Sequence, residues 1–510
     1  MRWRAGSVGP AAVVAVALAL LCAGCGGGGG GGGLDQSLRY FPADSSVVVV
    51  VSTDLESSQF KALDAIVEER VHRHIESFLR AGAQAVGFSW EEDVKPLLGH
   101  ELVVGSPTQP GLGGGGFVAV LHTSDGGKLR ERIENAKRFE KTSKTSGVQL
   151  YRDRRTQEEL AIDGDALVAA SSDATLRDAL ALAKGKDHLD EKTFRSRLGE
   201  RPTDALVQVY GDATALLSIP RVTPLRQIPW FDALRTFGAS LSFERRRALL
   251  DFRMNTDAKG LSDKDLPLAT GAAAPKVLRR TGEIVGANRN QSLTTAFLYR
   301  LAETALPNSR FVRDVHRLER IFGIDFVTEV LRQFDGPSAS AVSLDGKTYA
   351  ARSAVSDPAR LERLLPRLAP HLPRLVAGLQ GLRSEGEALL FVFAPDALTA
   401  RGTGVTVKRV GDLWRVRGLT GEGPNQLYFG VLGKVFVVAS DPRLAHRVAT
   451  EPVVAVPGAR GAAVSTVDLS GARADLSARL GFDPGPIGKI AIWLDASRQR
   501  LRGQLSVALP

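Results

Sequence analysis

Two stretches of the chain share one pattern and decide its predicted fold: residues 166–173 are ALVAASSD, and residues 434–441 are KVFVVASD. Each is an apolar run typical of a β-strand, and each ends in Ser-Asp. Asp173 and Asp441 suit the N-cap of a following helix, because a carboxylate there accepts hydrogen bonds from unpaired backbone N–H groups. Pro442 suits the first helical turn. The same strand-and-helix unit is therefore predicted at two places.

Weaker matches flank these stretches in the same order. Residues 47–54 (VVVVVSTD) match 284–290 (IVGANRN), and residues 205–212 (ALVQVYGD) match 463–470 (AVSTVDLS). Similar turns recur at 86–90 and 322–326, followed by strand-like runs at 101–105 and 338–344. Colinear matches with a variable spacing are what an old duplication leaves, so we predict that the body of the chain is duplicated.

The strand-like and helix-like runs in the rest of the chain predict an α+β fold. Each copy closes on a pair of strand-like runs, 239–243 with 248–254 and 489–494 with 501–509. Helices are predicted at 60–81 and 359–368, where apolar residues recur every three or four positions. The leucine stripe of the second helix suits core packing better than a membrane surface; it consists of Leu361, Leu364, Leu365 and Leu368. We therefore expect two related halves of mostly antiparallel sheet with packed helices, after a signal peptide and a disordered Gly linker.

The predicted organisation follows from length and composition. A chain of 510 residues is too long for one ordinary core, so at least two domains are expected. The predicted segments are a signal peptide with a lipobox (1–25), a flexible Gly-rich tether (26–38), a first α+β repeat (39–255), a linker (256–281) and a second α+β repeat (282–510).

The N-terminus is typical of an exported protein. Arg2 and Arg4 precede the uncharged apolar run 11–21 (AAVVAVALALL), and small residues follow it. The run is shorter than the roughly 20 residues that span a bilayer, which favours a cleaved signal over a retained anchor. Both alternatives remain open at this point.

Residues 21–25 (LCAGC) resemble the bacterial lipobox, in which an aliphatic residue and two small residues precede a cysteine. Cys22 departs from that pattern, because Leu, Val or Ile is usual there. The resemblance implies that the Cys25 thiol receives a diacylglyceryl group and that Cys25 becomes the mature N-terminus. The protein would then be lipid-anchored at the cell membrane and would face the extracytoplasmic side.

Composition restricts the chemistry of the body. Cys22 and Cys25 are the only cysteines, so the mature body would contain no disulfide, no cysteine zinc site and no catalytic thiol. The net charge of +10 suits anionic lipid or acidic wall polymer, although solvated, scattered arginines are the simpler interpretation. Nucleic acid is not expected as a partner, because no motif for it is present.

Each candidate active-site motif fails on its context. Gly111, Gly113 and Gly116 have G-x-G-x-x-G spacing, but a strand-like run follows where a dinucleotide site needs a helix. The S-x-x-K string at 58–61 lacks the accompanying motifs of penicillin-recognising enzymes. His72 and His74 are two residues apart on a predicted helix and cannot form an i, i+4 metal pair. No catalytic residue, cofactor or metal is therefore predicted, and a non-enzyme is favoured.

The start of the body carries a family resemblance. Residues 40–44 (YFPAD), leading into the strand-like run 47–51, resemble the start of bacterial extracytoplasmic proteins with a domain of unknown function numbered 3352 (DUF3352). Residues 205–212 and 322–325 are similar to that family too, and the resemblance extends over most of 38–510. The family implies no established activity.

Two functional hypotheses remain. The first is a non-catalytic, membrane-anchored lipoprotein that binds or scaffolds an envelope protein, polymer or lipid, with a cleft between related halves as its ligand site. The second is a cell-envelope hydrolase whose site is assembled only in the fold. The second requires acidic, basic or nucleophilic side chains that converge in one pocket.

Overall fold

The computed structural model describes residues 33–54, 57–64, 99–106, 116–123, 126–136, 138–154, 157, 159–198, 204–220, 222–244, 246–279, 284–371, 405–419, 424–456, 459–469 and 488–508. The chain divides into two compact units. The first holds Met1–Pro220, Arg235–Met254 and Leu509–Pro510, and the second holds Arg221–Leu234 and Asn255–Ala508. The predicted signal peptide with Cys25, most of the predicted helix 60–81 with its two histidines, and the turn at 86–90 lie outside the described residues.

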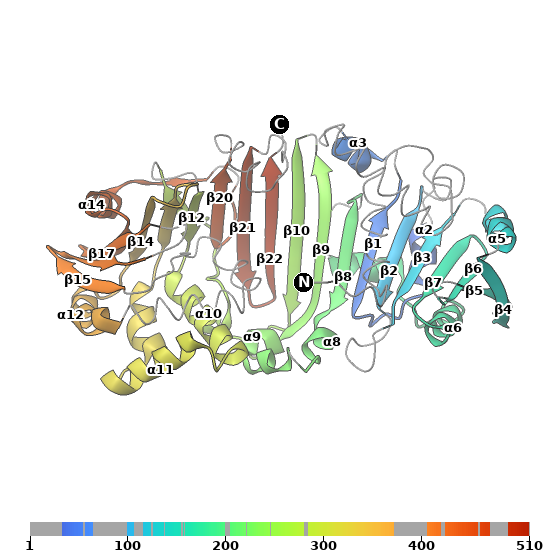
Figure 1. Cartoon of the computed structure of the whole chain (residues 1–510), viewed down its shortest axis with the longest axis horizontal. Helices are drawn as coiled ribbons and strands as arrows, with labels where there is room; N and C mark the ends of the chain where they lie inside the picture. The colour runs from blue at the N-terminus through green and yellow to red at the C-terminus, as the bar shows by residue number, and fades with distance from the viewer. Residues whose placement is uncertain are drawn as a thin grey trace. The chain divides into compact units, whose positions relative to one another are not determined.

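The first unit contains an antiparallel sheet whose strand order can be followed in Figure 1. Strand β1 (Val47–Ser52) lies between β2 (Glu101–Ser106) and β8 (Val207–Asp212). Beyond β2 follow β3 (Val118–His122), β7 (Ala166–Ala170), β6 (Glu159–Asp163), β5 (Val148–Asp153) and β4 (Phe139–Thr145). Beyond β8 follow β9 (Leu234–Glu244) and β10 (Arg247–Thr256).

The second unit repeats this order strand for strand. Strand β12 (Ile284–Asn288) lies between β13 (Ser338–Val342) and β20 (Ala463–Asp468), again antiparallel. Beyond β13 follow β14 (Tyr349–Ala354), β18 (Val435–Ala439), β17 (Gln426–Leu432), β16 (Leu413–Arg417) and β15 (Thr406–Val410). Beyond β20 follow β21 (Lys489–Ser497) and β22 (Arg500–Ala508).

The matched sequence stretches fall on equivalent strands, which confirms the predicted α+β fold with two related halves. The pairs are β1 with β12, β2 with β13, β7 with β18 and β8 with β20. Helix α6 (Asp173–Leu182) follows β7, as α14 (Pro442–Thr450) follows β18. Asp441 caps α14 as predicted, by accepting from the backbone N of Arg443 and Leu444. Ser172, and not Asp173, is the N-cap of α6, because its hydroxyl accepts from the backbone N of Thr175.

Helices cover the first sheet on one face. They are α2 (Gly33–Leu38), α6 and α7 (Glu191–Leu198), and their apolar side chains join those of β1, β2, β3 and β7 in one core. The other described helices of this unit are α3 (Ser58–Asp64), α5 (Gly126–Asn135) and α8 (Ala213–Leu217).

Helix α2 corrects the predicted tether, which extended to residue 38. Leu34 and Leu38 lie one helical turn apart and are buried, with exposures of 5% and 0%. The Asp35 carboxylate accepts a hydrogen bond from the backbone N of Glu191 at 2.9 Å. The chain is therefore packed on the first unit from Gly33 onward, since the glycine run ends there and two leucines supply buried surface. Residues 26–32 lie outside the described residues.

The predicted linker 256–281 packs within the second unit. Leu266 and Leu268 are fully buried in it. Strand β11 (Lys276–Leu278) pairs with β19 (Val453–Ala455), and Val277 and Leu278 join the core beneath α14. Residues 221–234, predicted as part of the first repeat, also belong to the second unit, because Trp230 of α9 (Pro229–Asp232) lies edge to face with Phe297 at 5.9 Å.

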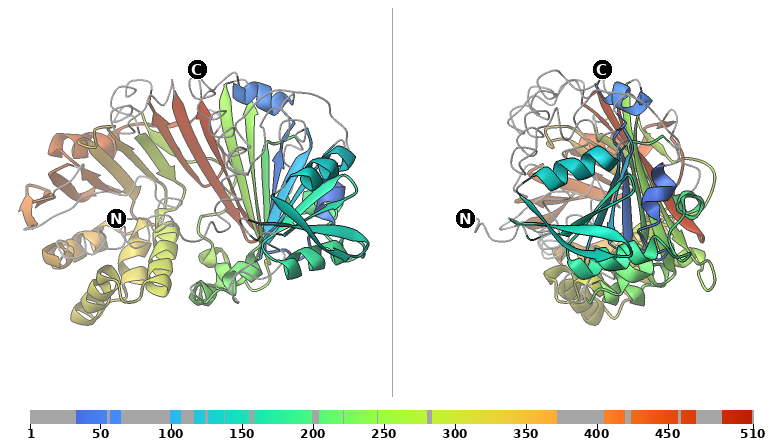
Figure 2. Two further views of the ribbon diagram at one scale, coloured as in Figure 1. Left: turned by 45° about the vertical axis from the view of Figure 1, so that its right-hand side comes forward. Right: turned by 90° about the vertical axis from the view of Figure 1, so that its right-hand side faces the viewer.

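The segment between β12 and β13 builds the helical part of the second unit. It comprises α10 (Gln291–Ala305), α11 (Arg310–Phe322), the π-helical turn η5 (Phe326–Val330) and the 3-10 turn η6 (Leu331–Phe334). Helix α12 (Pro358–Leu368) follows β14. Figures 1 and 2 show these helices, in yellow, gathered beside the strands of the second sheet. The α12 leucine stripe is buried, which confirms its predicted role in packing. No helix in the described part of the chain combines the length and the apolar character that crossing a membrane requires.

Candidate ligand-binding site in the second unit

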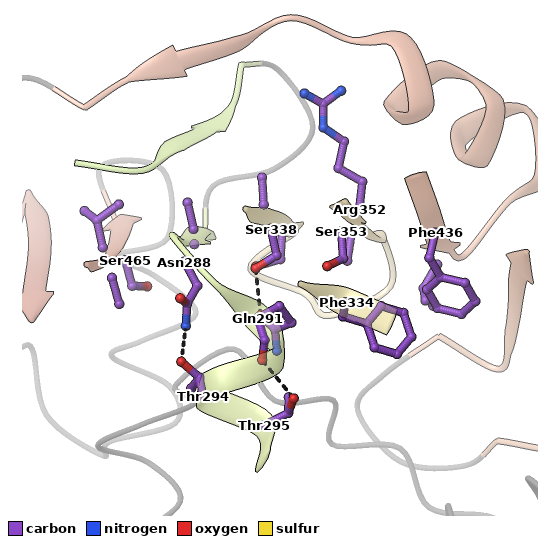
Figure 3. A pocket seen from close by; sticks show the side chains of 18 of the residues that line it. Asn288, Gln291, Thr294, Thr295, Phe334, Ser338, Arg352, Ser353, Phe436 and Ser465 are labelled. Atoms are coloured by element: carbon purple, nitrogen blue, oxygen red, sulfur yellow. Dashed lines mark hydrogen bonds between the residues drawn. The ribbon is translucent and has the colours of Figure 1, made fainter. Parts of the chain in front are cut away.

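A cavity of about 390 Å³ lies within the second unit, between one face of its sheet and the helical segment that joins β12 to β13 (Figure 3). Its lining residues come from six strands, β12, β13, β14, β18, β20 and β21, and from α10 and η6. The volume falls in the range of small-molecule sites, which are mostly apolar with a few placed polar groups.

Strand register explains the floor of the cavity. Alternate residues of a strand point to the same face, and directly paired residues of neighbouring strands share that face. Gly286 pairs with Ser340 on one side and with Ser465 on the other. Ser353 likewise pairs with Ser338. Much of the floor therefore consists of glycine and serine, whose small size leaves space above the sheet.

The walls of the cavity are apolar. Phe334 of η6 and Phe436 of β18 lie edge to face, with ring centroids 5.3 Å apart. Further large apolar side chains that line it include Leu298, Leu331, Val438, Ile492 and Leu494. A ligand in the cavity would therefore exchange water for hydrocarbon contacts along most of its length.

Hydrogen bonds between polar side chains join the start of α10 to β12 and β13. The Asn288 amide donates to Thr294 Oγ1 at 2.7 Å, and the Ser338 hydroxyl donates to Gln291 Oε1 at 2.7 Å (Figure 3). Asn290 caps α10 by accepting from the backbone N of Leu293. These contacts hold one rim of the cavity in place, because they join β12 and β13 to the first turns of α10.

Ser465 offers a hydrogen-bonding group to a ligand. The residue is 8% exposed and lines the cavity, and its hydroxyl has no hydrogen-bond partner among the described residues. A buried hydroxyl without a partner favours a ligand that can donate to it or accept from it.

The positive charge nearest the cavity points away from it. Arg352 lines the cavity from β14, but in Figure 3 its guanidinium extends to the other side of the sheet. There its Nη1 donates to the carbonyl oxygens of Val448 at 3.0 Å and Glu451 at 2.7 Å, at the end of α14. Burial lowers the pKa of Arg352 from its ordinary value, but an arginine remains a cation.

No carboxylate, imidazole, amine or thiol occurs among the described residues that line the cavity. A serine nucleophile needs an adjacent base to become reactive, and the lining hydroxyls have none there. The described lining is therefore suited to a ligand without charge.

The equivalent face of the first unit carries larger apolar side chains. Helices α6 and α14 occupy corresponding positions, so the opposite faces of the two sheets also correspond. In the first unit that face carries Val49, Val51, Leu102, Val104, Leu121 and Val207, which pack together. In the second unit it carries Gly286, Asn288, Ser338, Ser340, Ser353 and Ser465. The two units therefore differ in the side chains on this face, although their strand order is the same.

Equivalent backbone hydrogen bonds allow β1 and β12 to be compared residue by residue. The backbone N of Ser52 donates to the Leu206 carbonyl, and the backbone N of Arg289 donates to the Ala462 carbonyl in the same way. This aligns β1 with β12, in agreement with the sequence match, and sets Val49 against Gly286. Comparison of the two copies at alternate positions was the signal in the sequence that could have located the cavity.

The candidates considered from sequence lie elsewhere. Cys25 is outside the described residues. Ser58 of the S-x-x-K string donates to Asp204 Oδ2 at 3.3 Å in the first unit. Gly116 directly precedes the run that forms β3, so a strand and not a helix follows the glycine motif, as predicted; Gly111 and Gly113 are outside the described residues.

Comparison with known proteins identifies a family whose function is unknown. No curated protein matches the chain. Solved structures of TP0453 are distant: crystal form III is 10% identical with a TM-score of 0.27 and covers 44% of this chain and 82% of its own. Crystal form IV is 12% identical with a TM-score of 0.26 and covers 43% and 80%. Similarity at this level supports no conclusion about fold or function.

The family match is more specific. Residues 8–260 match the model described as "Protein of unknown function (DUF3352)". This range is shorter than the resemblance noted from short motifs, and it ends before β11, so it does not include the residues that line the cavity. Through residues 8–260 the chain belongs to the DUF3352 family, as its sequence predicted.

Proposed function

We propose that the protein is a lipid-anchored, extracytoplasmic binding protein that takes an uncharged, mainly apolar ligand into the cavity of its second unit. One observation carries the proposal. The same sheet face is packed with valine and leucine in the first unit, whereas in the second it is lined by glycine, serine and asparagine and encloses a cavity.

The lining selects the chemical class of the ligand. Apolar walls favour hydrocarbon, at about 25 cal/mol for each Å² removed from water. A charged group would lose its hydration without gaining a partner, because the Arg352 guanidinium is committed to the end of α14. A neutral glycerolipid, with acyl chains and few hydroxyl or ester groups, fits these requirements.

The anchor is the second part of the proposal. The lipobox-like sequence ending at Cys25 supports it, as does the uncharged apolar run before it. A lipidated cysteine with two or more chains would hold the protein stably at the membrane, since each buried CH₂ contributes about 0.8 kcal/mol. Membrane lipids would then lie close to the protein.

The two parts are tested separately. Replacement of Cys25 by serine should block lipid labelling and release the protein from the membrane fraction; a variant that stays membrane-bound and keeps its signal segment would disprove the anchor.

For the ligand, the mature chain, residues 25–510 with Cys25→Ser, should retain a monoacylglycerol in native mass spectrometry. It should not retain a lysophosphatidylglycerol with the same acyl chain. Equal retention of the two lipids would show that the cavity does not select an uncharged head group.

A further inference from the structure

Helix α11 presents a regular row of arginines to solvent. Arg310, Arg313, Arg317 and Arg320 recur at intervals of three and four residues and are all exposed. Residues at this spacing lie on one side of a helix. The opposite side carries Val312, Val315 and Leu318, which are buried.

Helix α12 extends this basic surface. Arg363 and Arg367 are one turn apart and exposed, and the Arg367 guanidinium lies 5.0 Å from the centre of the Phe322 ring. Leu364 and Leu368 of α12 pack with Phe322 and its neighbours, so the two helices touch. The arginine face is defined here as Arg310, Arg313, Arg317, Arg320, Arg363 and Arg367.

Much of this charge is not neutralised within the protein. Arg310 lies 3.6 Å from Asp314, and Arg360 of α12 pairs with Glu329 at 2.8 Å. Arg317, Arg320 and Arg363, by contrast, form no ion pair with any residue that the structure describes. The arginines of α11 and α12 also outnumber the acidic residues of these helices. The face is therefore suited to an anionic partner.

An exposed apolar side chain distinguishes the kind of partner. Ile321 is 52% exposed, and it lies one turn after Arg317 and directly after Arg320. A hydrated acidic polymer does not remove an exposed isoleucine from water, whereas the interfacial region of a bilayer does. The combination of cationic and apolar side chains on one helix face is typical of helices that lie on membrane surfaces.

We propose that the arginine face docks on an anionic phospholipid surface, with Ile321 entering the interfacial region. The proposal rests on the proposed function only in that the lipid anchor would keep this face close to a bilayer. Docking itself needs neither the lipid nor an occupied cavity, so it can fail or succeed independently of both.

The test uses the mature chain, residues 25–510 with Cys25→Ser, and sedimentation with vesicles. One set is phosphatidylcholine, and the other is phosphatidylcholine mixed with phosphatidylglycerol. The variant Arg313→Gln/Arg317→Gln/Arg320→Gln removes three charges from α11. The matched control, Lys128→Gln/Arg130→Gln/Arg132→Gln, removes three exposed charges from α5 of the first unit.

We expect binding to the anionic vesicles only, and a decrease of about five-fold for each arginine lost, hence about one hundred-fold for the triple variant. The control should bind like the parent, and raised salt should weaken binding. Ile321→Ser should reduce affinity for vesicles without changing affinity for a soluble poly(glycerol phosphate).

Equal loss in the two triple variants would show that net charge, and not this face, attracts the protein, and would overturn the proposal. The proposal would also fail if Ile321→Ser bound vesicles like the parent, or if the polymer bound more tightly than the vesicles, because the face would then recognise charge alone. Circular dichroism of each variant checks that its fold is retained. Lipid labelling at Cys25 and retention of acylglycerol report on the proposed function separately.

Discussion

Phe334 and Phe436 meet edge to face at 5.3 Å, one from the turn that ends the helical segment between β12 and β13 and the other from the second sheet. Their contact closes one side of a cavity whose floor is glycine and serine. The two rings therefore connect this helical segment to the sheet.

Filling the cavity should abolish ligand binding and leave the fold intact. In Gly286→Val/Ser465→Val the floor gains apolar side chains like those on the corresponding face of the first unit. We expect retention of acylglycerol in native mass spectrometry to fall by at least about ten-fold, or roughly 1.4 kcal/mol. The melting temperature should stay within a few degrees of the parent, because the first unit packs valines on the same framework. Undiminished binding would place the ligand elsewhere.

The Asn288 amide should matter for stability as well as for the site. Asn288→Ala leaves Thr294 Oγ1 and the backbone N of Asn290 without the partners that now lie at 2.7 and 2.9 Å. Loss of hydrogen bonds at a buried site costs about 1–3 kcal/mol, which urea denaturation can measure. Thr450→Ala, at an exposed position of α14, is the control and should change stability by less than about 0.5 kcal/mol. Equal effects of the two substitutions would contradict the structural role of Asn288.

Two equivalent helices should respond to different cap substitutions. Asp441→Ala removes the N-cap of α14 and should cost about 1 kcal/mol of folding free energy. In α6 the same cost should follow Ser172→Ala, whereas Asp173→Ala removes only an exposed ion pair with Arg177 and should cost about 0.3–0.5 kcal/mol. Denaturant unfolding of the three variants compares them directly. A larger loss for Asp173→Ala than for Ser172→Ala would show that the cap is assigned to the wrong residue.

Three buried tyrosines should resist ionisation at alkaline pH. Burial raises the pKa of Tyr40 and Tyr299 well above the ordinary value, and burial together with a hydrogen bond to Glu134 raises the pKa of Tyr151 to about 12. The folded state therefore binds these protons more tightly than the unfolded chain does. The resulting stability is complete below about pH 10 and is lost as pH rises toward the folded pKa values.

Ultraviolet absorbance of tyrosinate measures this effect. At about pH 11 the folded protein should show fewer ionised tyrosines than the same chain in denaturant. Tyr151→Phe should show a weaker decrease of stability between pH 10 and pH 12, because one of the linked protons is gone. Identical absorbance in the folded and denatured states at that pH would contradict the burial of these phenols.

Sequence reasoning identified the elements but not the cavity, for physical reasons. Apolar runs such as residues 435–439 form strands because alternate side chains find a core on each face, and that pattern is local. The packing of Leu34 and Leu38 was missed because it depends on a surface that distant strands create. The floor of the cavity was missed for the same reason, since Gly286 meets Ser340 and Ser465 only after strands far apart in sequence have paired.

The helical segment between β12 and β13 supplies both Phe334 at the cavity and the arginines of α11. Two partners of one segment are linked thermodynamically only when binding of one changes the affinity for the other. If docking on a bilayer changes the position of η6 relative to the sheet, it changes affinity for the cavity ligand, and the ligand must change affinity for the bilayer by the same factor. Reciprocity of this kind would let the protein release its ligand according to the surface on which it rests.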